Sequence, residues 1–155
     1  MKLTEHLGAA LAYLGEKPKA VALLMERRAI ACSAASGYVK FRAPRLQTRA
    51  IVHLAKRLAV AERELLAVSD ISERTYRRRR SRQEPLTSGE SDRLLRIARI
   101  AAEAERVFGS PAKSRRWLTA DSCLLGAKPL SLLGFDMGAR EVERELGRID
   151  FGDFA

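Results

Sequence analysis

The 155-residue sequence predicts an all-α protein: an N-terminal helical region with a helix-turn-helix, followed by a second helical domain. Three observations favour this fold class. Alanine, leucine, arginine and glutamate dominate while aromatic residues make up 6%, a mixture that favours helix over strand. Apolar residues recur at helical spacing along most of the chain. Capping residues, prolines and glycines fall at the ends of those periodic stretches, as helix boundaries require.

Residues 1–45 are expected to form an N-terminal helical extension. A first amphipathic helix is predicted over 3–15, closed by a glycine, and a second over about 18–31, opened by a proline. The following residues, 32–45, lack a helical period. They are interpreted as a connector with room for one short strand at 38–41.

Residues 46–85 are expected to form a helix-turn-helix DNA-binding domain. The pattern predicts one helix over 47–58 and a short one over 61–68, each with an apolar face. A two-residue break follows. Ser72 is then the predicted N-cap of a third helix, because its hydroxyl can accept an early backbone N–H. This helix carries exposed basic residues, which is typical of a recognition helix.

Residues 86–155 are expected to form a second helical domain. Thr87 and Glu90 predict a capping box at the start of a long helix that ends at Phe108 and carries a wide apolar stripe. Shorter helices are predicted to begin after Ser110 and at Pro129.

The last predicted helix runs from Ala139 to about Arg148 and leads into a tail with two phenylalanines and two acids. Gly138 is interpreted as the residue that leads into this helix. Trp117, on the helix after Ser110, is expected to lie in the core.

The net charge of +10 is unevenly distributed. Residues 1–85 contain 18 Lys and Arg against 8 Asp and Glu, whereas residues 86–155 contain 11 of each. The whole positive excess therefore lies in the first part, which suits a polyanion such as DNA or RNA. The neutral second part suits contact with protein.

Several classes of protein are not indicated. The sequence contains no GxGxxG, Walker, HExxH or GxSxG motif, so we expect neither an enzyme nor a cofactor. Cys32, Cys123, His6 and His53 lie outside metal-ligand spacings, and the cysteines are expected to be reduced. No apolar run approaches the ~20 residues that cross a bilayer and no secretory pattern opens the chain, so a cytoplasmic protein is expected.

The arginine-rich segment 71–82 is the candidate DNA-binding element. At ~100° per residue on a helix, its arginines cannot all face one groove. Tyr76 should pack inward with Ile71, and Arg79 should lie along the seam with its stem buried. The arginine fork can bond guanine O6 and N7 together, or a phosphate. The residues expected to face DNA are Ser72, Arg74, Thr75, Arg77, Arg78 and Ser81.

Residues 71–155 resemble the Xre/MbcA/ParS antitoxins. The resemblance covers about half of the chain and its motifs occur in the family's order. They are Arg74-Thr75-x-x-Arg78-Arg79, Glu84-Pro85-Leu86-Thr87, Glu90-Ser91-Asp92-Arg93-Leu94, Ala104-Glu105-x-Val107-Phe108-Gly109, Lys113-x-x-x-Trp117-Leu118, Pro129-Leu130-x-Leu132-Leu133, Gly138-Ala139-x-x-Val142 and Leu146-Gly147-x-Ile149-x-x-Gly152. This sequence departs from the family in having Asp70 at the usual glycine of the turn, Tyr76 at a usual leucine and Lys128 before Pro129.

The resemblance implies an antitoxin of a type II toxin–antitoxin module. Such a protein would neutralise a RES-type toxin, an enzyme that degrades NAD or transfers ADP-ribose, and would repress its own operon by binding operator DNA as a homodimer. It also implies that residues 86–155 are a toxin-binding domain whose C-terminus approaches the toxin. The residues expected to contact the toxin are Arg140, Glu143, Arg144, Asp150, Phe151, Gly152, Asp153 and Phe154.

Two other functions stay open at this stage. One is a stand-alone helix-turn-helix transcriptional regulator whose C-terminal domain only dimerises or senses a ligand. The other is an RNA-binding or nucleoid-type protein, which would bind random and operator DNA equally, with a steep dependence on salt.

Overall fold

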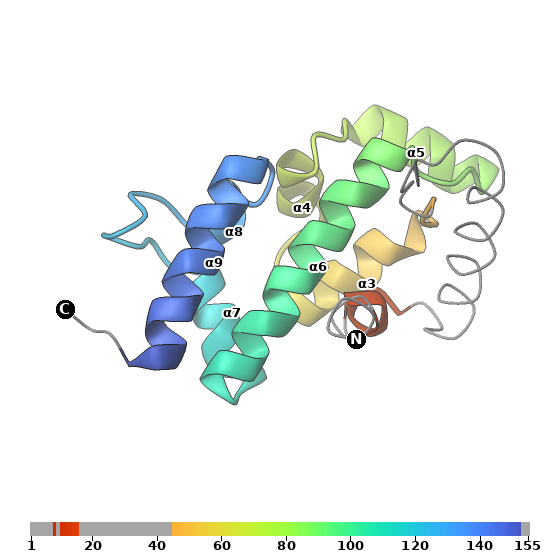
Figure 1. Cartoon of the computed structure of the whole chain (residues 1–155). Coiled ribbons are helices and arrows are strands. Elements are labelled where there is room, and N and C mark those ends of the chain that lie inside the picture. Colours follow the sequence, from red (N-terminus) through yellow and green to blue (C-terminus); the bar gives the residue numbers. More distant parts are fainter. Residues whose placement is uncertain (1–7, 9, 16–44, 153–155) are drawn as a thin grey trace, which may run out of the picture.

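The computed structural model describes residues 8, 10–15 and 45–152 (Figure 1). The regular secondary structure in these ranges is helical apart from an isolated antiparallel bridge between Ser122 and Ala127, which confirms the all-α prediction. None of their helices has the length and apolar character to cross a membrane. The helix expected at 18–31 and the extended segment at 38–41 lie outside the described residues. The labelled helices are α3 (Arg49–Leu58), α4 (Glu62–Val68), α5 (Glu73–Arg82), α6 (Ser88–Phe108), α7 (Pro111–Thr119), α8 (Pro129–Leu132) and α9 (Asp136–Phe151).

The first described helical turns, at residues 10–13, end at Gly15 as predicted, with a positive φ of 67°. Leu11 and Leu14 are fully buried. Tyr13 donates a hydrogen bond of 2.6 Å from its hydroxyl to Glu105 Oε2 in α6. The N-terminal turns therefore pack on the helical body rather than standing apart from it.

The helix-turn-helix consists of α4, a tight turn and α5, supported by α3. Asp70 in the turn has a positive φ of 56°, a conformation that aspartate tolerates better than most residues. Ile71 and Tyr76 are both buried, as the sequence predicted for the inner face of the third helix. Leu86 N donates a hydrogen bond of 2.8 Å to Leu46 O, which ties the end of this unit to its beginning.

The long helix α6 is the central element of the fold (Figure 1). Its capping box is formed as predicted: Thr87 Oγ1 accepts from Glu90 N, and Glu90 Oε2 accepts from Thr87 N at 2.7 Å. It packs against α3 on one side and against α7 and α9 on others. Residues from both predicted domains consequently share one hydrophobic core around α6.

The last helix differs from its prediction. It begins at Asp136 and ends at Phe151, rather than running from Ala139 to about Arg148. Gly138 is therefore the third residue of α9 and not a residue before it. A Cβ atom at this position would lie 2.3 Å from the carbonyl oxygen of Leu132. The glycine marks a close approach of α9 to α8, and its interpretation as the residue that leads into the helix was wrong.

Candidate DNA and protein interfaces

The N-terminus of α5 is built by Ser72. Its Oγ accepts a hydrogen bond of 3.2 Å from Thr75 N and donates one of 2.9 Å to Thr75 Oγ1. This confirms the predicted N-cap. Such a cap satisfies one backbone donor that the helix leaves unpaired and fixes the first turn in place. The side chains of that first turn are thereby presented to solvent at a defined angle.

The outward face of α5 is made by residues that the sequence analysis assigned to DNA. Arg74, Arg77, Arg78 and Ser81 are exposed, and Thr75 is half-buried. Arg77 Nη2 lies 2.8 Å from Glu73 Oε2, one turn earlier. Arg74 and Arg78 form no ion pair with any residue that the structure describes. These two guanidinium groups are therefore the ones available to an outside anion without breaking a contact.

The opposite face of α5 is fixed to its neighbours. Tyr76 OH donates a hydrogen bond of 2.8 Å to Glu62 Oε2 in α4. Burial, and then this bond to Glu62, raise the pKa of Tyr76, so it remains a neutral donor at physiological pH. Arg80 lies on the same side, 3.7 Å from Glu62. The arginine run is thus divided between two faces, as the helical geometry predicted.

Arg79 joins α5 to α6. Its guanidinium pairs with Glu90 of the capping box, and only 13% of the Arg79 side chain and 12% of the Glu90 side chain are exposed. Burial of Glu90 is outweighed by hydrogen bonds from Thr87 and Arg79, and the net result is a lowered pKa for Glu90. One carboxylate therefore caps α6 and anchors the recognition helix, which gives the helix-turn-helix a fixed orientation on α6.

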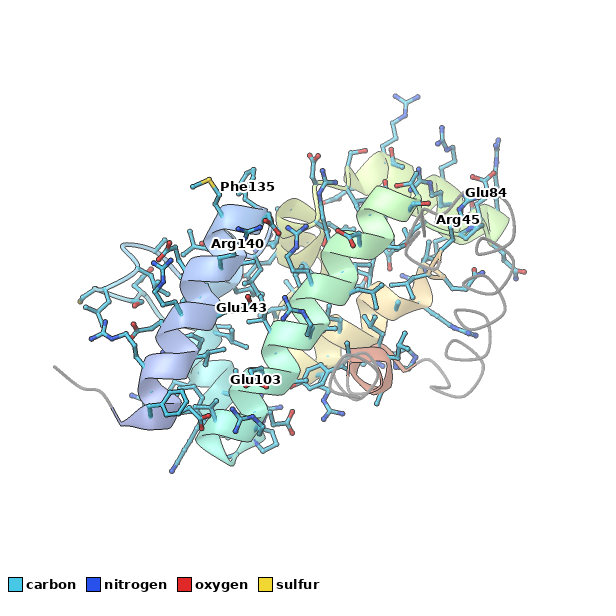
Figure 2. All side chains as sticks on the ribbon, in the orientation of Figure 1. Arg45, Glu84, Glu103, Phe135, Arg140 and Glu143 are labelled. Atoms are coloured by element: carbon cyan, nitrogen blue, oxygen red, sulfur yellow. The ribbon has the colours of Figure 1, made fainter. Side chains whose placement is uncertain are left out.

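The predicted toxin-facing residues of α9 divide into two groups. Arg140 and Arg144 are exposed and paired only within their own helix, with Asp136 at 3.0 Å and Glu141 at 2.6 Å. Glu143 instead pairs with Arg99 of α6. Figure 2 shows Arg140 and Glu143 along α9, with Phe135 at its N-terminal end. Arg140 and Arg144 are thus accessible, while Glu143 contributes to the seam between α9 and α6.

The end of α9 is also tied to α6. Asp150 Oδ2 lies 2.7 Å from Arg106 Nη2, which binds Glu103 Oε1 at 2.7 Å as well. These two hydrogen bonds raise the pKa of Arg106. Phe151 is 85% exposed, and Gly152 ends the helix with a positive φ of 75°. Asp150 and Phe151 are therefore helical, whereas the predicted contacts Asp153 and Phe154 lie outside the described residues.

The exposed apolar side chains gather in the C-terminal part of the chain. Among the described residues, the large hydrophobic side chains that remain exposed are Leu124, Phe135, Met137 and Phe151. Of these, sequence reasoning had assigned only Phe151 to an interface. Phe135 and Met137 stand at the start of α9. There the surrounding residues of the fold, rather than the helical period, decide which side chains are buried. Trp117, expected in the core, is half-buried, and its ring packs at a tilt of 45° against Phe108 with the ring centroids 5.5 Å apart.

The fold and these surfaces define the class of protein: a helix-turn-helix DNA-binding unit joined to a helical domain with an exposed apolar and charged surface. Residues 39–99 match the family described as the antitoxin Xre-like helix-turn-helix domain. Residues 103–152 match the antitoxin Xre/MbcA/ParS C-terminal toxin-binding domain. The first description names a helix-turn-helix domain and the second a toxin-binding domain, and this antitoxin family is not a family of enzymes, in agreement with the expectation for this chain.

Three similar proteins are each named Antitoxin Xre. One, from Pseudomonas putida, is 42% identical over 51% of this chain and 50% of its own length. Another, from Yersinia enterocolitica, is 32% identical over 63% of this chain and 67% of its own. A third, from Photorhabdus laumondii, is 33% identical over 57% of this chain and 62% of its own. The chain belongs to the Xre antitoxin family, and its matched region spans between half and two thirds of these relatives.

Proposed function

We propose that this protein is the antitoxin of a type II toxin–antitoxin module that neutralises a RES-type toxin and binds operator DNA to repress its own operon. The observation that carries the proposal is the separation of two unlike surfaces on one helical body. The arginine face of α5 lies in the part that matches a helix-turn-helix domain. The exposed apolar side chains lie in the part that matches a toxin-binding domain.

The DNA-binding role is assigned to Arg74 and Arg78 above all, with Ser72, Thr75, Arg77 and Ser81 beside them. A single helix-turn-helix buries little surface, and a homodimer on a roughly palindromic operator would double it. Autorepression follows if that operator lies before the antitoxin's own gene. A cytoplasmic location is part of this proposal, since operator DNA and the toxin's substrate NAD are found there.

Operator binding can be tested by comparing Arg78→Ala with Arg80→Ala. Arg78 is exposed on the predicted DNA face, whereas Arg80 turns away and contacts Tyr76 and Glu62. Loss of a base or phosphate contact by Arg78 should weaken operator binding by about 1–3 kcal/mol, or roughly 5- to 150-fold. Arg80→Ala should have a much smaller effect. Equal losses for both variants in a salt-controlled binding assay would contradict the assigned face.

Toxin neutralisation is assigned to Arg140, Arg144 and the end of α9, with Phe151 as the apolar anchor and Asp153 and Phe154 beyond it. Because α9 continues to Phe151, truncation after Gly152 removes the tail without shortening the helix. That truncation and Phe151→Ala should each reduce neutralisation of a co-expressed RES toxin while leaving operator affinity unchanged. Full neutralisation by both variants would place the toxin surface elsewhere.

A further inference from the structure

In the C-terminal part of the chain, one segment carries basic side chains that no ion pair neutralises. Every arginine and every acid of α6 and α9 contacts an opposite charge. Between Pro111 and Lys128 the situation is different. This segment carries Lys113, Arg115, Arg116 and Lys128 against a single acid, Asp121. None of the four basic side chains forms an ion pair with the described residues.

Helix α7 presents two of these charges directly to solvent. Ser114 and Leu118 are buried against the body of the protein. At ~100° per residue, Arg116 points almost directly away from that buried side, with Lys113 beside it. Both are exposed. We call Lys113 and Arg116 the α7 basic patch.

Helix stability does not account for the charge at Lys113, although Arg116 stands in the last turn of α7, where the helix dipole favours a cation. Lys113 stands in the first turn of α7, where the helix dipole disfavours a cation, and no acid is present in that turn. Arg116 is three residues further on, a spacing at which like charges weaken a helix. A cluster of unneutralised cations raises the local potential and attracts an anionic partner from a distance set by the ionic strength.

We propose that the α7 basic patch docks against an acidic surface of the toxin and accelerates formation of the complex. This inference rests on the proposed function. The patch lies wholly within residues 103–152, the part that matches a toxin-binding domain. The loop that follows α7 also presents Leu124 with 70% of its surface exposed. Arginine together with exposed apolar side chains is characteristic of protein interfaces. A phosphate backbone, by contrast, offers no apolar surface against which a leucine could pack.

DNA is the other polyanion to consider, and the arrangement of the helices disfavours it. Figure 1 shows α5 and α7 toward opposite ends of α6. Arg79 anchors α5 at Glu90, near the beginning of α6, while α7 begins after the end of α6. At ~1.5 Å per residue, the 21 residues of α6 span about 30 Å. The patch is therefore remote from the recognition helix.

The test measures association of the full chain with the purified RES-domain toxin at several salt concentrations. The patch variant combines Lys113→Glu with Arg116→Glu. The matched control combines Lys56→Glu with Arg63→Glu, which changes net charge equally at exposed residues of α3 and α4. We expect the patch variant to associate about tenfold more slowly or worse, with a flatter salt dependence, and the control to change by less than about threefold. Thermal unfolding checks that both variants fold, and Lys113→Gln with Arg116→Gln should give an intermediate rate.

Each outcome has a distinct meaning. If the wild-type protein binds the toxin and the patch variant behaves as the control does, this inference is wrong and the proposed function stands. If the patch variant loses operator affinity at physiological salt while its toxin association is unchanged, the patch is a DNA contact and the inference is also wrong. If the wild-type protein does not bind the toxin, the proposed function fails and the inference fails with it.

Discussion

Gly138 gives the sharpest prediction about the packing of α8 and α9, which carry the proposed toxin-facing surface. An added Cβ atom would lie 2.3 Å from Leu132 O and 3.0 Å from Leu132 Cβ, although ordinary contacts begin at 3.4 Å. The conflicting atom is a backbone carbonyl, which cannot rotate away as a side chain can. Gly138→Ala must therefore move α9 away from α8 by about 1 Å, a distance that follows from the two values above.

The size of the effect follows from two opposing terms. Overpacking of this kind typically costs about 1–3 kcal/mol, and a backbone clash belongs in the upper part of that range. Replacing a helical glycine by alanine returns roughly 1 kcal/mol. The net expectation is a loss of about 1–2 kcal/mol in the free energy of unfolding. For a chain of this length that corresponds to a fall in Tm of roughly 2–8 °C.

The matched control is Gly147→Ala, in the same helix. A Cβ atom at Gly147 meets nothing within 4 Å, so this variant should be stabilised by about 0.5–1 kcal/mol. Urea and thermal unfolding of both variants measure the difference directly. Equal stability of the two variants would refute the close approach of α8 and α9 described above.

Two further predictions concern pH. Because Glu90 has a pKa below its ordinary value of 4.5, its stabilising contribution is present above that value and is lost as the pH falls through its lowered pKa. Glu90→Gln should therefore reduce the acid sensitivity of unfolding, and an unchanged acid limb in denaturant titrations would contradict the role of its bonds to Thr87 and Arg79. Burial, and then the hydrogen bond to Glu105, raise the pKa of Tyr13 to about 12, so its contribution is present below pH 10 and is lost between about 10 and 12. Tyr13→Phe should lack this alkaline loss of stability. Because the pKa of Tyr76 is raised as well, tyrosinate absorbance should show that the substitution removes one of two late-ionising tyrosines.

Local sequence signals were sufficient for the caps of two helices and for the inner face of α5. The cap at Ser72, the capping box at Thr87 and the inward position of Tyr76 each depend on atoms within one helical turn, and all three are confirmed. The same reasoning failed at Gly138. A glycine that precedes a helix and a glycine inside a helix that allows another helix to approach look identical in sequence, because the second depends on a contact in space, here with Leu132 of α8.

The sequence by itself determined the all-α fold, the helix-turn-helix and the imbalance of charge between the two parts of the chain, because periodicity, capping and charge counts are properties of neighbouring residues. Only the tertiary structure decided which charges remain free. Asp150 reaches Arg106 across 44 residues and Tyr13 reaches Glu105 across 92, and such pairs arise from the packing of α9 and the N-terminal turns on α6. A part of the chain that is neutral by count therefore carries an unneutralised basic patch on α7, since neutralisation depends on distances in space rather than on position in sequence.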